Sequence, residues 1–300
     1  MKMPVDGIGE FGLIKRFRNL IKNGPSVIKG PGDDCAVLIP DKDKYQLFTC
    51  DMLVEGVDFR SAENPYLVGR KALAVSISDI AACAGIPRHC LVSLAMPKKT
   101  AVKFVDRFFK GIRDMAKEYK INLVGGDLSR ARQLTIDVSL LGVVEKKYLV
   151  LRSGARPRDI IFVTGPLGGS IRGKHLKFCP RITEARYLAQ NFKINSMIDI
   201  SDGLVQDLGH ILEESRVGAV IYENLIPLSR TARGLSDALY MGEDFELLFT
   251  LPPKEAQRLY VRKIKGFQPI GEVMPDKYGL RLMGIKGKEN IIRPRGFRHF

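Results

Sequence analysis

The chain contains 300 residues, 45% of them hydrophobic and 27% charged, with 29 glycines and 16 prolines. This composition is typical of a globular protein with a sizeable core, and the length predicts about two domains. No apolar stretch approaches the roughly 20 residues that cross a bilayer, and the amino terminus carries acidic residues in place of a secretory signal. Five cysteines without a Cys-x-x-Cys pair argue against a disulfide framework or a zinc site. We therefore expect a cytoplasmic protein with reduced thiols.

The net charge of +15 raises the question of nucleic-acid binding. The basic residues are dispersed, however, and none of them forms an uninterrupted block of five or more. No aromatic stacking motif accompanies them. A solvated basic surface that also attracts anionic nucleotides explains the charge better. A basic nucleic-acid-binding protein remains the alternative from a different functional class.

The predicted elements mix helices and strands twice along the chain. We expect an amphipathic helix over residues 7–20, strands near 37–39 and 47–50, and a helix from about Pro65 whose ALAVSIS segment is either helical or extended. A strand over 91–97, a helix over 102–119 and a strand over 134–144 follow. The basic stretch 152–158 predicts the entry to a second domain, which holds the strands DIIFVTG and FELLFTLPP, a helix after Asp202 and a terminal β-segment. This mixture predicts two α/β-type (α+β) domains rather than one doubly wound sheet.

Five apolar runs stop at or beside an aspartate. The residues are Asp33 and Asp34 of VIKGPGDD, Asp51 of YQLFTCD, Asp79 of ALAVSISD, Asp127 of INLVGGD, and Asp199 and Asp202 of MIDISD. Such repetition indicates strand ends that converge on one acidic site. Carboxylates held close together cannot all stay ionised without a cation. Because Mg²⁺ prefers hard oxygen ligands and commonly bridges to substrate phosphates, the sequence predicts a magnesium site that handles phosphates.

Two stretches have the glycine content of phosphate-binding loops. Residues 168–175 (GGSIRGKH) nearly match G-x-x-x-x-G-K-[ST], but His175 stands where a Ser or Thr hydroxyl must bind Mg²⁺, so a plain glycine-rich turn is the better interpretation. Gly125 and Gly126, directly before Asp127, let the backbone approach a ligand closely and turn its N–H groups toward phosphate oxygens.

The segment MIDISDGLVQDLGHILEE predicts a strand followed by a helix. Asp202 is the expected N-cap of that helix. Asp199 lies three residues earlier in an apolar setting, where an unpaired carboxylate is expensive, which favours a metal-binding role. Ser201 between them offers a hydroxyl for a phosphate or nucleotide.

A series of motifs occurs in one order: GEFGLI, PGDDCAV, TCDMLVEGVDF, KALAVSISDIAACAGIP, LVGGD, RSGARPRD, MIDISDGL, MGEDFELLFTLPP and GFRHF. Together they closely resemble the thiamine-monophosphate kinase family, within the aminoimidazole ribonucleotide synthetase superfamily. The resemblance implies ATP-dependent phosphorylation of thiamine monophosphate to thiamine diphosphate, with several Mg²⁺ ions and without a P-loop. It also implies an amino-terminal domain over residues 1–146, whose mixed sheet binds ATP and Mg²⁺ and pairs in a homodimer. A carboxy-terminal α/β domain over residues 147–300 would complete the nucleotide and substrate cleft.

The same resemblance assigns roles to individual residues. Metal ligands are expected at Asp33, Thr49, Cys50, Asp51, Asp79, Asp127, Asp199 and Asp202, and ATP contacts at Gly126, Asp127, Arg152 and Ser201. Substrate contacts are expected at Asp58, Phe109, Glu243 and Phe297. Cys50 stands where the family usually has Thr or Ser, so its backbone carbonyl is the expected ligand. Asp34 is expected only to shape its loop.

Three departures from the family concern the thiamine half of the site. Asp58 replaces a usual substrate-contacting His, Met241 replaces a Gly, and the segment between residues 165 and 197 is shorter than in many relatives. The metal and ATP half follows the family more closely.

The expected reaction is in-line transfer of the γ-phosphoryl group of ATP to the substrate phosphate. A phosphate monoester is already an anionic nucleophile, so positioning and charge neutralisation by Mg²⁺ are needed, and a general base or a side-chain nucleophile is not. Another ATP-dependent synthetase or kinase of the superfamily remains an alternative. The chain lacks the amino-terminal reactive Cys and Lys of a selenophosphate synthetase and the carboxy-terminal Cys of a hydrogenase-maturation relative.

Overall fold

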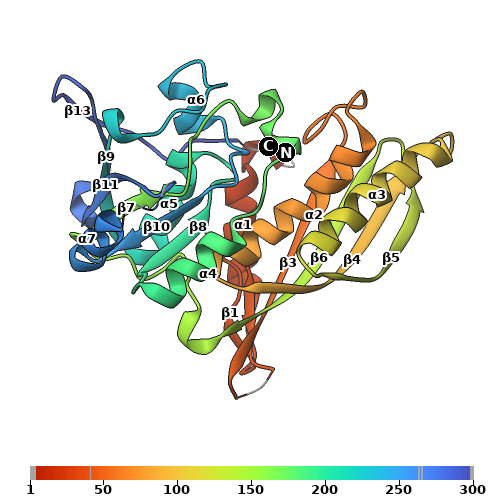
Figure 1. The fold of residues 1–300 in the computed structure, drawn as a ribbon, viewed down its shortest axis with the longest axis horizontal. Helices are drawn as coiled ribbons and strands as arrows, with labels where there is room; N and C mark the ends of the chain where they lie inside the picture. The colour runs from red at the N-terminus through yellow and green to blue at the C-terminus, as the bar shows by residue number, and fades with distance from the viewer. Residues whose placement is uncertain (1–4, 41, 263, 265, 298–300) are drawn as a thin grey trace.

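Two β-sheets divide the chain between them, as Figure 1 shows in a computed structural model. The structure describes residues 5–40, 42–262, 264 and 266–297. The end of the GFRHF motif, residues 298–300, therefore lies outside the described residues. The sequence-based expectation of a two-part α+β architecture with a mixed amino-terminal sheet is confirmed.

The first sheet has six strands in the order β1-β2-β3-β6-β4-β5. They are β1 (Val27–Lys29), β2 (Ala36–Leu38), β3 (Lys44–Val54), β4 (Ile86–Met96), β5 (Asn122–Arg130) and β6 (Thr135–Glu145). Only β4 and β5 pair in parallel; the other neighbours are antiparallel. Helices α2 (Pro65–Ala82) and α3 (Val102–Glu118) cover one face of this sheet, seen on the right of Figure 1.

Helix α2 is the central helix of the molecule. The side chain of Asn64 accepts a hydrogen bond from the Tyr66 N–H, and Pro65 occupies the first turn, so the helix starts where its free backbone N–H groups are best satisfied. Its ALAVSIS segment is helical and almost wholly buried. Because α2 packs on β3 and β6 and also on the second sheet, residues along it reach the junction of the two halves.

The second sheet has seven strands in the order β13-β12-β9-β11-β7-β10-β8. They are β7 (Ile160–Val163), β8 (Ser196–Asp199), β9 (Val217–Tyr222), β10 (Leu247–Leu251), β11 (Gln268–Pro275), β12 (Leu280–Met283) and β13 (Glu289–Ile291). This half of the chain also contains α4 (Ile182–Asn191), α5 (Leu204–Ser215), α6 (Leu235–Tyr240) and α7 (Pro253–Val261). Neighbouring strands are antiparallel except β9 and β12.

The amino-terminal helix differs from its sequence pattern. A short 3₁₀ turn, η1 (Val5–Gly7), precedes α1 (Glu10–Leu20), so the helix begins three residues later than predicted. Its apolar residues Ile14, Phe17 and Leu20 are exposed. The amphipathic pattern therefore does not place this helix on the core. No helix within the described part of the chain is long and apolar enough to cross a membrane.

Candidate functional site: a carboxylate cluster between two cavities

Buried carboxylates from three separate elements meet at the junction of the two sheets. Oxygens of Asp34, Asp79 and Asp199 lie within 4.8 Å of one another, and an oxygen of Asp33 lies equally close to Asp34 and the Cys83 sulfur. Asp33 and Asp34 come from the loop before β2, Asp79 from α2 and Asp199 from the end of β8. Residues far apart in the sequence thus build one acidic site.

Hydroxyl groups hold these carboxylates in place. Ser76 Oγ donates to Asp51 Oδ2 at 2.7 Å, and Ser78 Oγ donates to Asp199 Oδ2 at 2.6 Å. Both serines lie on α2, which also carries Asp79, and the Thr49 hydroxyl of β3 donates to Asp79. One helix and one strand therefore orient most of the cluster.

Burial is the main cause of an unusual ionisation at this site. Burial and, after it, the neighbouring carboxylates raise the pKa of Asp33 to about 7, that of Asp51 to about 6 and that of Asp199 to about 8. Burial also raises the pKa of Asp79 well above its ordinary value. Closely spaced anions shielded from water therefore resist ionisation together unless a cation joins them.

The residues present fit such a cation. Asp34 Oδ2 is buried and has no hydrogen-bond partner among the described residues. An orphaned buried carboxylate oxygen is costly, and the carboxylate group that carries it also has an oxygen within 4.8 Å of two further carboxylates. An all-oxygen set of this kind suits Mg²⁺.

Two basic side chains balance part of the negative charge. Arg152 Nη2 donates to Asp34 Oδ1 at 2.8 Å, while the Arg152 backbone N–H donates to Asp33 Oδ2 at 3.1 Å. Lys29 Nζ lies 3.8 Å from Asp33 Oδ2. The predicted ATP contact Arg152 is thus placed beside the predicted metal ligands.

Two cavities flank the cluster. The smaller, of about 410 Å³, is lined by Asp51, Asp58, Glu243 and Phe297 among others. The larger, of about 840 Å³, is lined by Asp33 and Arg152 and by residues of α1 and α5. Ser201 and Asp202 line both. Two ligands in the two cavities would therefore meet at these residues.

Four predicted residues are not brought to the cluster within one chain. Cys50 is exposed, because alternation along β3 turns its side chain to the face opposite Thr49 and Asp51. Gly126 and Asp127 lie on the edge strand β5, and both β6 and β4 separate them from β3. At about 4.8 Å per strand, they are roughly 14 Å from the Asp51 strand. Phe109 lies on α3, packed against the core, and lines neither cavity.

The picture of converging strand ends also needs correction. Asp79 lies in a helix, Asp51 and Asp127 lie inside long strands, and only Asp199 ends a strand. Short apolar runs look alike in helices and strands, which explains the error. Asp34, expected only to shape its loop, is a member of the cluster.

Asp202 is not the N-cap of α5. Gly203 occupies that position, and the Asp207 carboxylate accepts from the backbone N–H groups of Asp202 and Gly203 at 3.1 and 3.0 Å. Asp207 and His210 approach Asp202 with ligand atoms within 4.8 Å, and His210 lines the larger cavity. Sequence reasoning missed both. The spacing of Asp207 and His210 on one helix face was the available signal.

A fully buried lysine joins the two substrate-side residues. Lys71, 1% exposed, donates to the Asp58 carbonyl oxygen at 2.6 Å and pairs with the Glu243 carboxylate. The Asp58 side chain accepts from the Val54 N–H at 2.7 Å. The Asp58 carboxylate therefore binds the backbone of its own loop. A lysine inside an apolar helix was the sequence signal for Lys71, because such a residue is buried only with partners.

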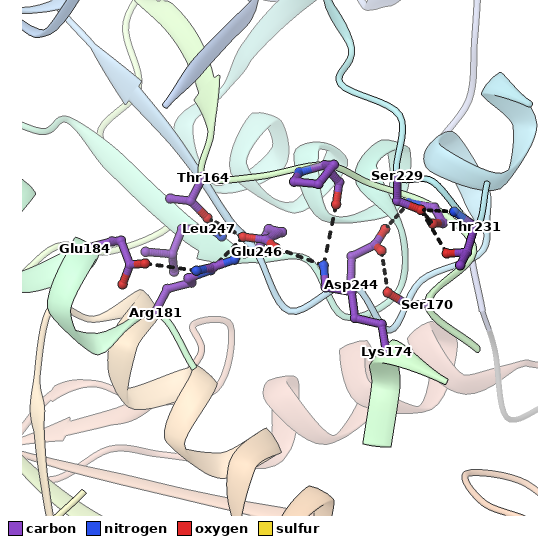
Figure 2. A network of polar contacts seen from close by, with 12 residues as sticks. Thr164, Ser170, Lys174, Arg181, Glu184, Ser229, Thr231, Asp244, Glu246 and Leu247 are labelled. Atoms are coloured by element: carbon purple, nitrogen blue, oxygen red, sulfur yellow. Dashed lines mark hydrogen bonds and ion pairs between the residues drawn. The ribbon is translucent and has the colours of Figure 1, made fainter. Parts of the chain in front are cut away.

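The glycine-rich segment 168–175 is not a phosphate loop. It forms two short 3₁₀ helices, η3 (Ser170–Arg172) and η4 (Lys174–Leu176). The Gly168 N–H and the Ser170 hydroxyl both donate to Asp244, at 2.8 and 2.7 Å, as Figure 2 shows for Ser170. A protein carboxylate already occupies these donors, which agrees with the rejection of a P-loop.

Known proteins match this chain along nearly its whole length. Family models described as AIR synthase related protein match residues 32–144 as the N-terminal domain and residues 150–282 as the C-terminal domain. The thiamine-monophosphate kinase of Rhodopirellula baltica is 37% identical over 310 residues, which cover 97% of each chain. That of Escherichia coli strain K12 is 33% identical over 327 residues, which cover 97% of this chain and 98% of the relative.

Solved structures agree. The structure described as AaThiL complexed with AMPPCP and TMP has a TM-score of 0.88 and 31% identity, with 100% of both chains covered. Thiamine-monophosphate kinase from Stenotrophomonas maltophilia K279a has a TM-score of 0.74 and 28% identity, with 90% of this chain and 95% of the other covered. The chain belongs to the thiamine-monophosphate kinase family of AIR synthase related proteins.

Proposed function

We propose that this protein phosphorylates thiamine monophosphate to thiamine diphosphate with ATP and Mg²⁺, by direct in-line phosphoryl transfer. The observation that carries the proposal is the buried carboxylate cluster at the meeting point of two cavities. Support comes from the structural neighbour described with AMPPCP and TMP, which matches the whole chain.

The two cavities suggest how the substrates lie. The larger cavity takes ATP, with Arg152 and Ser201 near its phosphates, and the smaller takes thiamine monophosphate between Glu243 and Phe297. Ser201 and Asp202 line both cavities, so the γ-phosphoryl group and the acceptor phosphate would meet there. Bringing two anions together in reacting geometry is the main requirement of this chemistry.

Asp33, Asp34, Asp51, Asp79, Asp199 and Asp202 are the residues that would hold Mg²⁺. When bound, Mg²⁺ neutralises charge on the transferring phosphoryl group and on the two phosphates that repel each other. Ser76, Ser78 and Thr49 keep the carboxylates oriented by donating hydrogen bonds to them. The acceptor phosphate is already anionic at neutral pH, so no side chain has to remove a proton.

We further propose that a homodimer completes the site. Strand β5 is exposed along its whole length, and Phe48, Met52 and Leu91 are exposed although they lie on the first sheet. A second copy that covers this apolar face would bury it and would bring its own Phe109, Gly126 and Asp127 toward the cluster. This arrangement accounts for the predicted ATP and metal contacts that one chain leaves remote.

We also propose a domain boundary and a cellular location. The division between residues 146 and 147 falls in the gap between the two family-model matches, next to the end of β6 at Glu145. A cytoplasmic location would suit an enzyme that consumes ATP, and five free cysteines agree with a reducing compartment.

A substrate panel tests the proposed reaction. Purified protein with ATP and Mg²⁺ is given thiamine monophosphate, thiamine or aminoimidazole precursors, and products are separated by chromatography. We expect thiamine diphosphate from the monophosphate alone. Product from an aminoimidazole precursor would favour another synthetase of the superfamily. Steeply salt-dependent nucleic-acid binding without any ATP turnover would favour the nucleic-acid alternative.

A further inference from the structure

His175 lies in the smaller cavity, in the glycine-rich segment that has no phosphate-binding role. It belongs to η4 and is 5% exposed, and its ring lines the cavity together with Glu243 and Phe245. A buried imidazole with one face on a substrate cavity is a recognition group that the reaction itself does not need.

The hydrogen bonds of His175 define its tautomer. Nδ1 lies 3.0 Å from the Ser170 carbonyl oxygen. A carbonyl oxygen only accepts, so Nδ1 carries the proton and Nε2 of the neutral ring is an acceptor. The described residues offer Nε2 no hydrogen-bond partner. This atom is therefore available to a donor on the ligand.

The surrounding network fixes the position of the ring. Ser170 is anchored by Asp244, and Lys174, the residue before His175, donates to Glu246 at 2.8 Å. Arg181 also donates to Glu246, from Nε and Nη2 at 2.8 Å each, so the segment is tied at several points, as Figure 2 shows. Asp244 and Glu246 flank Phe245, which lines the same cavity. The segment that carries His175 is thus hydrogen-bonded to the segment that carries Asp244, Phe245 and Glu246, and both line the smaller cavity.

The chemistry of thiamine monophosphate identifies the matching group. Its phosphate oxygens and pyrimidine ring nitrogens accept hydrogen bonds, and its thiazolium ring is a cation. The exocyclic amino group of the aminopyrimidine carries its only N–H bonds. We propose that His175 Nε2 accepts a hydrogen bond from this amino group and thereby selects aminopyrimidine substrates. The inference rests on the proposed function and adds a specificity-determining residue to it.

A substrate analogue tests the pairing. Oxythiamine monophosphate carries a carbonyl oxygen in place of the amino group, so it would set an acceptor against Nε2. We expect the wild-type protein to prefer thiamine monophosphate by at least about tenfold in kcat/KM, the effect of one hydrogen bond or more. Equal use of the two substrates by the wild-type protein would overturn the inference without any variant.

Two matched variants separate recognition from folding. His175→Asn keeps a donor near Nδ1 for the Ser170 carbonyl but has no atom at Nε2, whereas His175→Gln can place its amide oxygen near the Nε2 position. We expect His175→Asn to raise the KM for thiamine monophosphate about tenfold, to leave the KM for ATP within about twofold, and to lose the preference over oxythiamine monophosphate. His175→Gln should regain part of that preference.

The remaining outcomes are also decisive. If the wild-type protein makes thiamine diphosphate but His175→Asn keeps the full preference, the inference fails while the proposed function stands. His175→Asn could instead lower kcat/KM equally for both substrates, while kcat/KM of the wild-type protein falls as an imidazolium deprotonates. This result would mean that Nε2 donates to the phosphate, and it would also overturn the inference. No thiamine diphosphate from the wild-type protein would instead refute the proposed function. Thermal unfolding of each variant reports whether it is folded.

Discussion

Asp34 places one carboxylate oxygen on the Arg152 guanidinium and leaves the other buried without a partner among the described residues. It belongs to two of the three groups of potential ligands among the described residues, one with Asp79 and Asp199 and one with Asp33 and Cys83. We expect Asp34 to act in the site through its negative charge. An amide side chain of the same shape should therefore not replace it.

Asp34→Asn tests that contribution. The amide keeps the size of the side chain but removes a proposed metal ligand and half of the ion pair with Arg152. We expect at least a roughly 100-fold loss of kcat, and a loss of unfolding free energy of about 1–3 kcal/mol because a buried charge loses its partner. Activity assays and urea unfolding measure the two effects. Asp276→Asn, at an exposed position, is the control; equal behaviour of the two variants would contradict the account.

At the residue scale, the apolar runs that end at aspartates pointed to the same acidic residues as the family motifs, and also to Asp34, which the resemblance assigned only to loop structure. Asp79 and Asp199 meet in the carboxylate cluster, and Asp51 accepts a hydrogen bond from Ser76 beside it; their role as metal ligands stays a prediction. Lys71 was missed, and Asp34 was assigned only to loop structure, because their contacts depend on partners distant in the chain, Glu243 and Arg152, which no spacing rule connects.

Helix α2 organises the cluster at the scale of elements. Three of its residues face the site: Ser76 and Ser78 donate to carboxylates, and Asp79 supplies one. The two serines are two positions apart and reach different aspartates, so the helix orients ligands from both β3 and β8. A shift of this helix would disturb both halves of the site.

Ser78→Ala removes one of these orienting contacts without changing a ligand. Loss of a hydrogen bond to a metal-binding carboxylate typically weakens metal affinity or activity 10- to 100-fold. We therefore expect the Mg²⁺ concentration at half-maximal rate to rise about tenfold, with the protein still folded. A magnesium titration of the initial rate gives this value. Ser236→Ala on the surface of α6 is the matched control and should behave like the wild-type protein. An unchanged titration for Ser78→Ala would argue that the hydroxyl does not orient Asp199.

The existence of most elements could be predicted, but their roles were harder to assign. Periodicity predicted the helix at residues 102–119 and the strand at residues 134–144, close to α3 and β6. It could not decide whether ALAVSIS is helix or strand, because a segment buried on all sides has no polar face to reveal its period. It also could not reveal that β5 is an edge strand, since strand order depends on pairing between distant segments.

At the scale of the whole molecule, the exposed face of the first sheet is the proposed dimer interface. If a second copy covers it, a charge placed in its centre should separate the subunits. We expect Leu91→Glu to convert a dimer to a monomer in sedimentation and to reduce turnover about 100-fold, because Asp127 of the partner subunit would be lost from the site. Val261→Glu, at an exposed position on α7, should change neither property. A wild-type monomer with full activity would refute the composite site.

The buried aspartates would also couple the proposed metal binding to the stability of the whole protein. Their folded pKa values of about 7, 6 and 8 exceed the ordinary value of 3.8 for Asp33, Asp51 and Asp199. Between about pH 4 and pH 8 the folded state therefore binds more protons than the unfolded state, so these groups make the metal-free protein less stable as pH rises. Mg²⁺ bound to the cluster, as proposed, would remove this penalty by replacing the protons.

We accordingly expect Mg²⁺ to raise the Tm more at pH 8 than at pH 6, relative to the same buffer with EDTA. Differential scanning fluorimetry measures the Tm with Mg²⁺ and with EDTA at each pH. Because each Tm increment is a difference at one pH, the pH dependence of groups that do not contact the metal cancels. Matching the ionic strength of the Mg²⁺ and EDTA buffers excludes a general salt effect. An increment that is equal at both pH values, or larger at pH 6, would show that the cluster does not exchange protons for the metal.

The central claim is that the buried carboxylate cluster performs phosphoryl transfer from ATP to thiamine monophosphate. The most direct measurement follows ADP and thiamine diphosphate together for the wild-type protein and for Asp79→Asn, whose folding is checked by circular dichroism. We predict one thiamine diphosphate per ADP for the wild-type protein, strictly dependent on thiamine monophosphate and Mg²⁺, and a loss of roughly 1,000-fold in the variant. Absence of thiamine diphosphate at every Mg²⁺ concentration, or equal turnover by a folded Asp79→Asn protein, would contradict the account.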